Sequence, residues 1–120
     1  MARYEVLNNV EHADLRVVTH FGAAYGDSVG MLPAFPTEFA ELQREYPIFL
    51  KQDAGSGEYQ PVILLGFEPR ENLFLHEGRW AANYLPGAVA RGPFLIGFQQ
   101  RGTAGEPETE PVIHVDMEHP

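Results

Sequence analysis

The chain lacks cysteine and lacks long apolar runs. Without cysteine, thiolate nucleophiles, disulfides, CxxC redox motifs and thiolate zinc sites are excluded. The longest apolar run, Pro61–Phe67, is far shorter than the roughly 18 to 20 residues that span a bilayer, so we expect no transmembrane helix. The N-terminal segment also has no apolar stretch followed by a small-residue cleavage site. These absences predict a cytoplasmic location, and the alternative is the cell surface, reached by a non-classical export route.

Basic residues are scarce as well. Eight Lys and Arg face seventeen Asp and Glu, which gives a formal net charge of −9, and the arginines are scattered along the chain. Such a surface repels a phosphate backbone, so we expect no nucleic-acid partner. The motifs HExxH, GxSxG, GxGxxG and the Walker-type glycine loop are all missing. The sequence therefore predicts no cofactor and marks no catalytic residue.

What is present is the composition of a folded protein. Hydrophobic residues make up 44% of the 120 residues, and the aromatic ones are 8 Phe, 5 Tyr and 1 Trp. This length suits one domain, which we place at residues 1–120.

The pattern of apolar and turn residues predicts an α+β fold. A helix is expected from Pro36 to about Glu45, and Pro47 should end it. Its apolar stripe consists of Phe35, Phe39, Leu42 and Tyr46. A second short helix is expected over Tyr84–Arg91. Strands are expected at Leu15–Phe21, Ile48–Lys51, Gln60–Phe67, Leu73–Leu75, Pro93–Gln99 and Pro111–Met117, and a solvated loop at Arg101–Glu110. Short connections favour a mostly antiparallel sheet of about five to six strands, with Gln60–Phe67 at its centre.

Two residue sets are candidates for a site. His114 and Asp116 form an H-x-D pair, which supplies two ligands of a non-haem iron facial triad and places both on one strand face. The strands that carry the third ligand in that architecture do not follow here, so we favour a polar strand face and keep the metal pair as the alternative. That alternative could also use His20 or His76.

The second set is aromatic and cationic. Trp80, Tyr84 and the neighbouring aromatics can fill the core, which is the commoner use, or can line a ligand pocket or partner groove. Arg79 and Arg91 are the cationic residues that lie beside aromatic residues in the sequence. The predicted ligand or partner surface is therefore Arg79, Trp80, Tyr84 and Arg91.

Taken in order along the chain, several short segments resemble the SapC family of bacterial proteins linked to surface layers. They are Leu15-Arg16-Val17, Glu38-Phe39, Glu45-Tyr46-Pro47-Ile48, Pro61-Val62, Leu64-Leu65-Gly66, Glu71-Asn72-Leu73-Phe74, Gly78-Arg79-Trp80, Tyr84-Leu85-Pro86 and Pro93-Phe94. Gly87 and Gly92 stand where the family pattern has bulkier residues. The family usually continues beyond the equivalent of Pro120, so the expectation is a truncated or a short natural member.

The resemblance implies a bacterial, cell-surface-associated protein without established catalytic residues. From it we expect a non-catalytic accessory protein with a protein partner, which is a neighbouring enzyme or receptor. The competing hypothesis is a small-molecule-binding or metal-dependent enzyme, or a subunit of one, that uses His114 and Asp116. A third hypothesis is half of a longer protein that exposes an apolar patch, through which the isolated chain would form a homodimer.

Overall fold

The computed structural model describes residues 2–102, 105 and 108–120. Contacts divide the chain into two compact units. The core unit is Thr19–Ala90 with Pro120, and the hairpin unit consists of the residues up to Val18 together with Arg91–His119.

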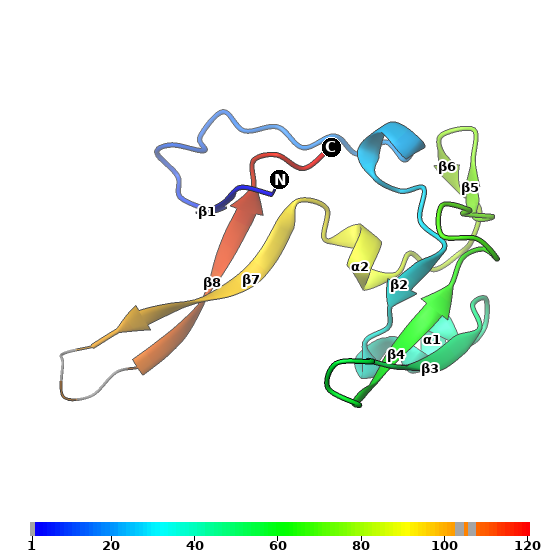
Figure 1. Cartoon of the computed structure of the whole chain (residues 1–120). Coiled ribbons are helices and arrows are strands. Elements are labelled where there is room, and N and C mark those ends of the chain that lie inside the picture. The colour runs from blue at the N-terminus through cyan, green and yellow to red at the C-terminus, as the bar shows by residue number, and fades with distance from the viewer. Residues whose placement is uncertain (1, 103–104, 106–107) are drawn as a thin grey trace. The chain divides into compact units, whose positions relative to one another are not determined.

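A three-stranded antiparallel sheet forms the centre of the core unit (Figure 1). It contains β2 (Met31–Pro33), β3 (Ile48–Gln52) and β4 (Tyr59–Leu64), in the order β2-β4-β3. The expected hairpin of β3 and β4 is confirmed, and so is the central position of the second strand. Ile63 in β4 is fully buried, as its place in the middle of an apolar run predicts.

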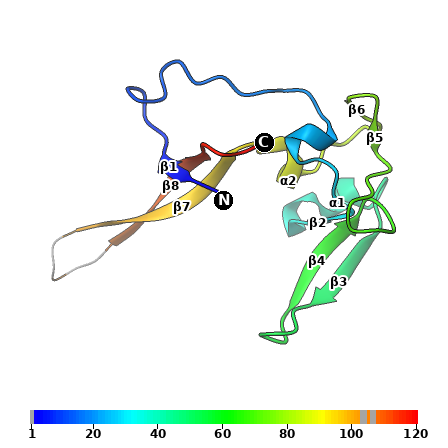
Figure 2. The same ribbon diagram turned by 45° about the horizontal axis from the view of Figure 1, so that its top comes forward.

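A short helical segment covers this sheet. It consists of the 3₁₀ turn η2 (Pro36–Glu38) and the helix α1 (Phe39–Leu42), which both views show alongside the sheet (Figures 1 and 2). Pro36 lies in the first turn, where its missing N–H costs nothing. The helix is shorter than predicted. Of its predicted stripe, Leu42 and Tyr46 are buried in the core cluster with Ile63 and Phe39 packs against that cluster, but Phe35 is exposed.

The rest of the core unit is built from short elements. These are η1 (Ala23–Tyr25), the two-stranded hairpin of β5 (Leu75–His76) and β6 (Arg79–Trp80), and the helix α2 (Gly87–Ala90). The strand β5 shares only Leu75 with the predicted strand Leu73–Leu75, whereas α2 lies within the predicted helix Tyr84–Arg91 and is shorter than expected. Phe74 and Trp80 pack against the core cluster.

The hairpin unit is a second antiparallel sheet of β1 (Tyr4–Val6), β7 (Phe94–Arg101) and β8 (Glu108–Asp116), in the order β1-β8-β7. Figures 1 and 2 show β7 and β8 as a long two-stranded ribbon. The strands extend into the predicted loop Arg101–Glu110, of which residues 103–104 and 106–107 lie outside the described part. Among the described residues, Val115 is the only apolar side chain of this unit that is buried.

The predicted fold class is confirmed. The described residues contain eight strands in three antiparallel sheets and two short α-helices. One strand prediction was wrong, because Leu15–Phe21 has no strand. Val17 and Val18 there are exposed, so their β-propensity is not supported by burial. No helix among the described residues is long and apolar enough to cross a membrane.

Candidate functional site

The densest group of polar side chains in the core unit surrounds Tyr46. The Tyr46 hydroxyl accepts a hydrogen bond from Trp80 Nε1 at 2.7 Å and donates one to the Tyr84 carbonyl oxygen at 2.6 Å. Tyr46 is only 2% exposed, so its hydroxyl replaces water for both groups. It thereby ties the segment between α1 and β3 to β6 and to the segment that precedes α2.

Glu45, the neighbour of Tyr46, binds the same segment from another side. Its carboxylate accepts hydrogen bonds from the backbone N–H of Asn83 at 2.9 Å, from the Asn83 side-chain amide at 3.1 Å and from the backbone N–H of Tyr84 at 2.8 Å. The two backbone donors lower the pKa of Glu45, because they stabilise the ionised form. The carboxylate therefore holds the chain at residues 83 and 84.

Glu38 makes the third attachment. Its Oε1 accepts hydrogen bonds from the Tyr84 hydroxyl and from the Gly87 backbone N–H, both at 2.7 Å. The bond to Glu38 raises the pKa of Tyr84, because the phenol must keep its proton to donate. A Cβ at position 87 would lie 2.9 Å from Oε1, so the glycine gives this carboxylate room.

This arrangement is an anchoring network, which we define as Glu38, Glu45, Tyr46, Trp80 and Tyr84. Most of its donors and acceptors are directed at one another or at backbone groups, and Glu38 Oε2 is buried without a hydrogen-bond partner. Burial raises the pKa of Tyr46, which keeps its hydroxyl protonated and unsuited to proton transfer near neutral pH. The geometry fixes α1, β6 and the start of α2 in place, which is a structural task.

The network includes two members of the predicted partner surface. Trp80 and Tyr84 both contact Tyr46, and Trp80 is partly buried, with its ring stacked on Phe74 at a centroid distance of 6.3 Å. Arg79 precedes Trp80 in β6 and is exposed. Arg91 is exposed too, but it belongs to the hairpin unit, where its guanidinium donates to the Phe94 carbonyl oxygen at 3.5 Å.

The H-x-D pair lies at the end of β8. Asp116 Oδ1 accepts hydrogen bonds from the backbone N–H groups of Arg3 and Glu118, both at 3.0 Å, so it joins the start of the chain to the turn after β8. The His114 ring lies across Gly97 of β7, where a Cβ would clash with it. No group of three or more His, Asp or Glu side chains that could hold a metal ion occurs in the described part of the chain.

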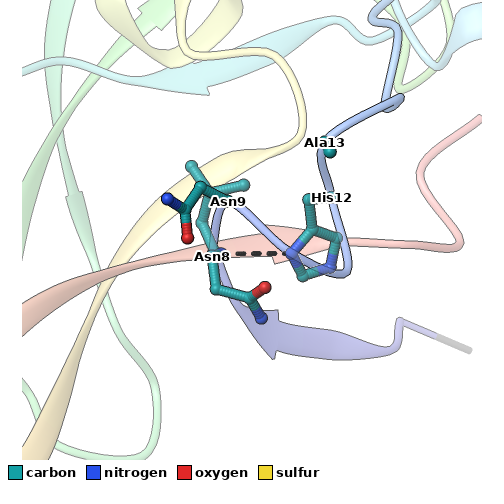
Figure 3. Close-up of a pocket in the computed structure, with 5 residues that line it drawn as sticks. Asn8, Asn9, His12 and Ala13 are labelled. Atoms are coloured by element: carbon teal, nitrogen blue, oxygen red, sulfur yellow. Dashed lines mark hydrogen bonds between the residues drawn. The ribbon is translucent and has the colours of Figure 1, made fainter.

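A small open depression occurs in the N-terminal segment of the hairpin unit (Figure 3). Leu7, Asn8, Asn9, His12 and Ala13 line it. His12 is buried, with Nδ1 accepting the Asn8 backbone N–H at 3.2 Å and Nε2 lying 3.3 Å from Glu5 Oε2. Both ring nitrogens are thus occupied, and the imidazole orders the turn after β1. The polar context of His12 in the sequence gave no indication of this burial.

With this geometry in view, we compared the chain with known proteins. The family model of SapC matches residues 7–120. The chain belongs to the SapC family. No curated protein and no solved structure matches it.

The segments that carry the SapC resemblance meet in the anchoring network. Glu38-Phe39, Glu45-Tyr46, Arg79-Trp80 and Tyr84-Leu85 each contribute at least one of its members. Glu38 lies beside the apolar stripe of the predicted helix, and the sequence does not reveal its bond to Tyr84. A charged residue beside an apolar stripe gives no hint of a partner 46 positions away.

Proposed function

We propose that this SapC-family chain is a non-catalytic accessory protein that binds a protein partner. The observation that carries the proposal is an exposed apolar surface on the core unit. Leu50 in β3 is 67% exposed and Tyr59 in β4 is 64% exposed. Leu50 pairs with Pro61, so Leu50 and Tyr59 are diagonal neighbours on one face of the sheet. We call these two residues the tip surface.

The tip surface has the chemistry of a binding site for a protein. Tyrosine offers a large apolar ring with a polar hydroxyl, and such residues are enriched where partners bind. The core of this unit is already filled by Leu42, Tyr46, Ile63 and Leu65, so the tip surface is not needed to complete it.

The side chains that could act in acid–base catalysis take part in hydrogen bonds that hold the fold, which supports the proposal of a non-catalytic protein. Glu38, Glu45 and Tyr46 are engaged in the anchoring network, and Asp116 accepts two backbone N–H groups. A rigid core that displays apolar residues at one end of a hairpin is a suitable scaffold for recognition. We place the partner at the cell surface or in a neighbouring enzyme or receptor, as the family resemblance implies.

The test is affinity purification of the full-length protein from its native cell. The wild-type chain should retain a defined envelope protein or enzyme, and the double variant Leu50→Lys, Tyr59→Lys should lose it. Val10→Lys is the matched control, because Val10 is 81% exposed and lies in the other unit. A soluble protein without any co-purifying partner would refute the proposal, and so would equal retention by the double variant.

A further inference from the structure

We infer that β7 is a pairing edge, through which two copies of this chain join their hairpin units into one continuous antiparallel sheet. This inference is independent of the partner proposed above, because it concerns another unit and needs no second protein. It rests on the backbone of β7, on the side chains that flank its edge, and on the small amount of apolar surface buried within the hairpin unit.

The outer edge of β7 carries backbone groups that β8 does not use. The Asp116 N–H donates to the Pro93 carbonyl oxygen at 2.9 Å, which fixes the alternation of the ladder. From that bond, Leu95, Gly97 and Gln99 exchange hydrogen bonds with β8, whereas Ile96, Phe98 and Gln100 direct their N–H and C=O groups outward. No strand pairs with this edge in the part of the chain that the structure describes.

The side chains beside that edge are apolar and exposed. Ile96 is 69% exposed and Phe98 is 71% exposed, and both lie on the face that also carries Ile113 of β8. Exposed edges in monomeric proteins are usually protected by proline, lysine or an inward-pointing charge. Residues 94–100 of β7 contain none of these.

The other edges of the two larger sheets are less suitable. β8 extends beyond β1, but Pro111 lies there and directs its missing N–H toward that edge, which blunts it. β3 is also an edge strand, but it has five residues against eight in β7 and carries Lys51. β7 is therefore the longest edge without a protecting residue.

The outer edge of β7 is self-complementary, so the strand that pairs with it is β7 of a second copy. Two antiparallel β7 strands related by a twofold axis at Gly97 would place each Ile96 opposite the second copy's Phe98. Pairs of an aromatic and a β-branched residue stabilise adjacent strands. The same register would place the two Gly97 residues opposite each other, with each His114 ring lying over its own Gly97 on the face opposite Ile96 and Phe98. Apart from Arg101, β7 carries no charge, so little local repulsion opposes the pairing.

The area available is sufficient for a modest dimer. Ile96 and Phe98 flank the edge and together expose roughly 300 Å² of apolar side chain per copy. With the paired backbones added, the interface stays at or below about 1,200 Å² in total, the size range of weak and reversible complexes. Val115 is the only buried apolar residue that the structure describes in the hairpin unit, so pairing also covers surface that this unit leaves open.

The first test is the mass of the purified 120-residue chain by sedimentation equilibrium over a range of concentrations. The expected result is a concentration-dependent doubling of the 13.4 kDa monomer, with a dissociation constant on the order of micromolar. Phe98→Lys should raise that constant at least about tenfold. Phe67→Lys, which makes the same substitution at an exposed position in the other unit, should leave it unchanged. A wild-type chain that stays monomeric at concentrations of about 10 μM and above overturns the inference.

The register has its own test, because the chain has no native cysteine. In a mixture of the Ile96→Cys and Phe98→Cys variants, an oxidant should produce a disulfide-linked dimer of one copy of each. Each variant alone should link several-fold less, because the proposed register does not place a residue opposite its own equivalent at 96 or 98. Equal linking in all three samples would overturn the register.

Ile113→Lys distinguishes pairing of the strand edges from stacking of the sheet faces. The variant should still dimerise if the strands pair by their edges, and a variant that no longer dimerises would instead indicate stacking of the faces.

Discussion

Replacing Tyr46 by phenylalanine tests whether the anchoring network stabilises the core unit. The change removes one oxygen and leaves the ring in place. It leaves the Trp80 Nε1–H and the Tyr84 carbonyl oxygen without the partner that the structure gives them, at 2.7 and 2.6 Å. An unsatisfied buried polar group costs about 1 to 3 kcal/mol. Both groups are only partly buried, so we expect a combined loss of about 2 kcal/mol in the free energy of unfolding.

The assay is urea unfolding followed by tryptophan emission. Trp80 is the only tryptophan and belongs to the core unit, so its fluorescence reports the unfolding of that unit. Tyr59→Phe is the matched control, since the Tyr59 side chain is 64% exposed and water can replace the lost bond. The control should change the free energy of unfolding by less than about 0.5 kcal/mol. If the two variants are equally stable, Tyr46 contributes only its ring, and the account of the network given above is wrong.

Two further predictions concern the carboxylates of the network. Gly87→Ala should lower the melting temperature, because the new Cβ would lie 2.9 Å from Glu38 Oε1. Gly55→Ala is the control and should not lower it, because no atom lies closer than 3.8 Å to a Cβ at that position. Thermal unfolding followed by circular dichroism compares the two variants. The folded-state pKa of Glu45 lies below its ordinary value of 4.5, so its carboxylate stabilises the fold above that pH and loses the effect as the pH falls through the folded value. Glu45→Gln should therefore be less stable than wild type at pH 7, and the difference should shrink as the pH falls below 4.5; a difference that stays constant as the pH falls would contradict the assignment.

The sequence predicted those strands and helices whose apolar residues form a continuous run or a helical stripe. The apolar run around Ile63 indicated a central strand, which the structure confirms. The predicted stripe indicated a helical face, and its residues Leu42 and Tyr46 are buried, whereas Phe35 is 45% exposed. Leu15–Phe21 has an equally β-prone sequence but forms no strand. A β-branched segment becomes a strand only when a neighbour offers it hydrogen bonds and cover, and propensity does not contain that information.

The hydrogen bonds of the candidate site were harder to predict, because they join residues that are far apart in the sequence. Trp80 and Tyr84 were selected as aromatic residues of a surface, and the structure shows that each is held by a bond to a residue more than thirty positions earlier. Gly87 was noted only as a departure from the family pattern. Its role becomes visible once Glu38 is known to accept its backbone N–H at 2.7 Å. Such long-range polar pairs leave no periodic trace in a sequence.

The two units differ in how they are stabilised, and this difference indicates where partners act. The core unit buries Ala34, Leu42, Tyr46, Ile63 and Leu65 in one cluster and fastens its loops to it through Glu38 and Glu45. The hairpin unit, as far as it is described, buries Val115 alone among its apolar residues, while Ile96, Phe98 and Ile113 are exposed. A sheet gains stability mainly by covering an apolar face, so a unit that covers so little gains most from an added strand. Association at β7 would therefore affect stability as well as recognition, whereas association at the tip surface would leave the stability of the already filled core nearly unchanged.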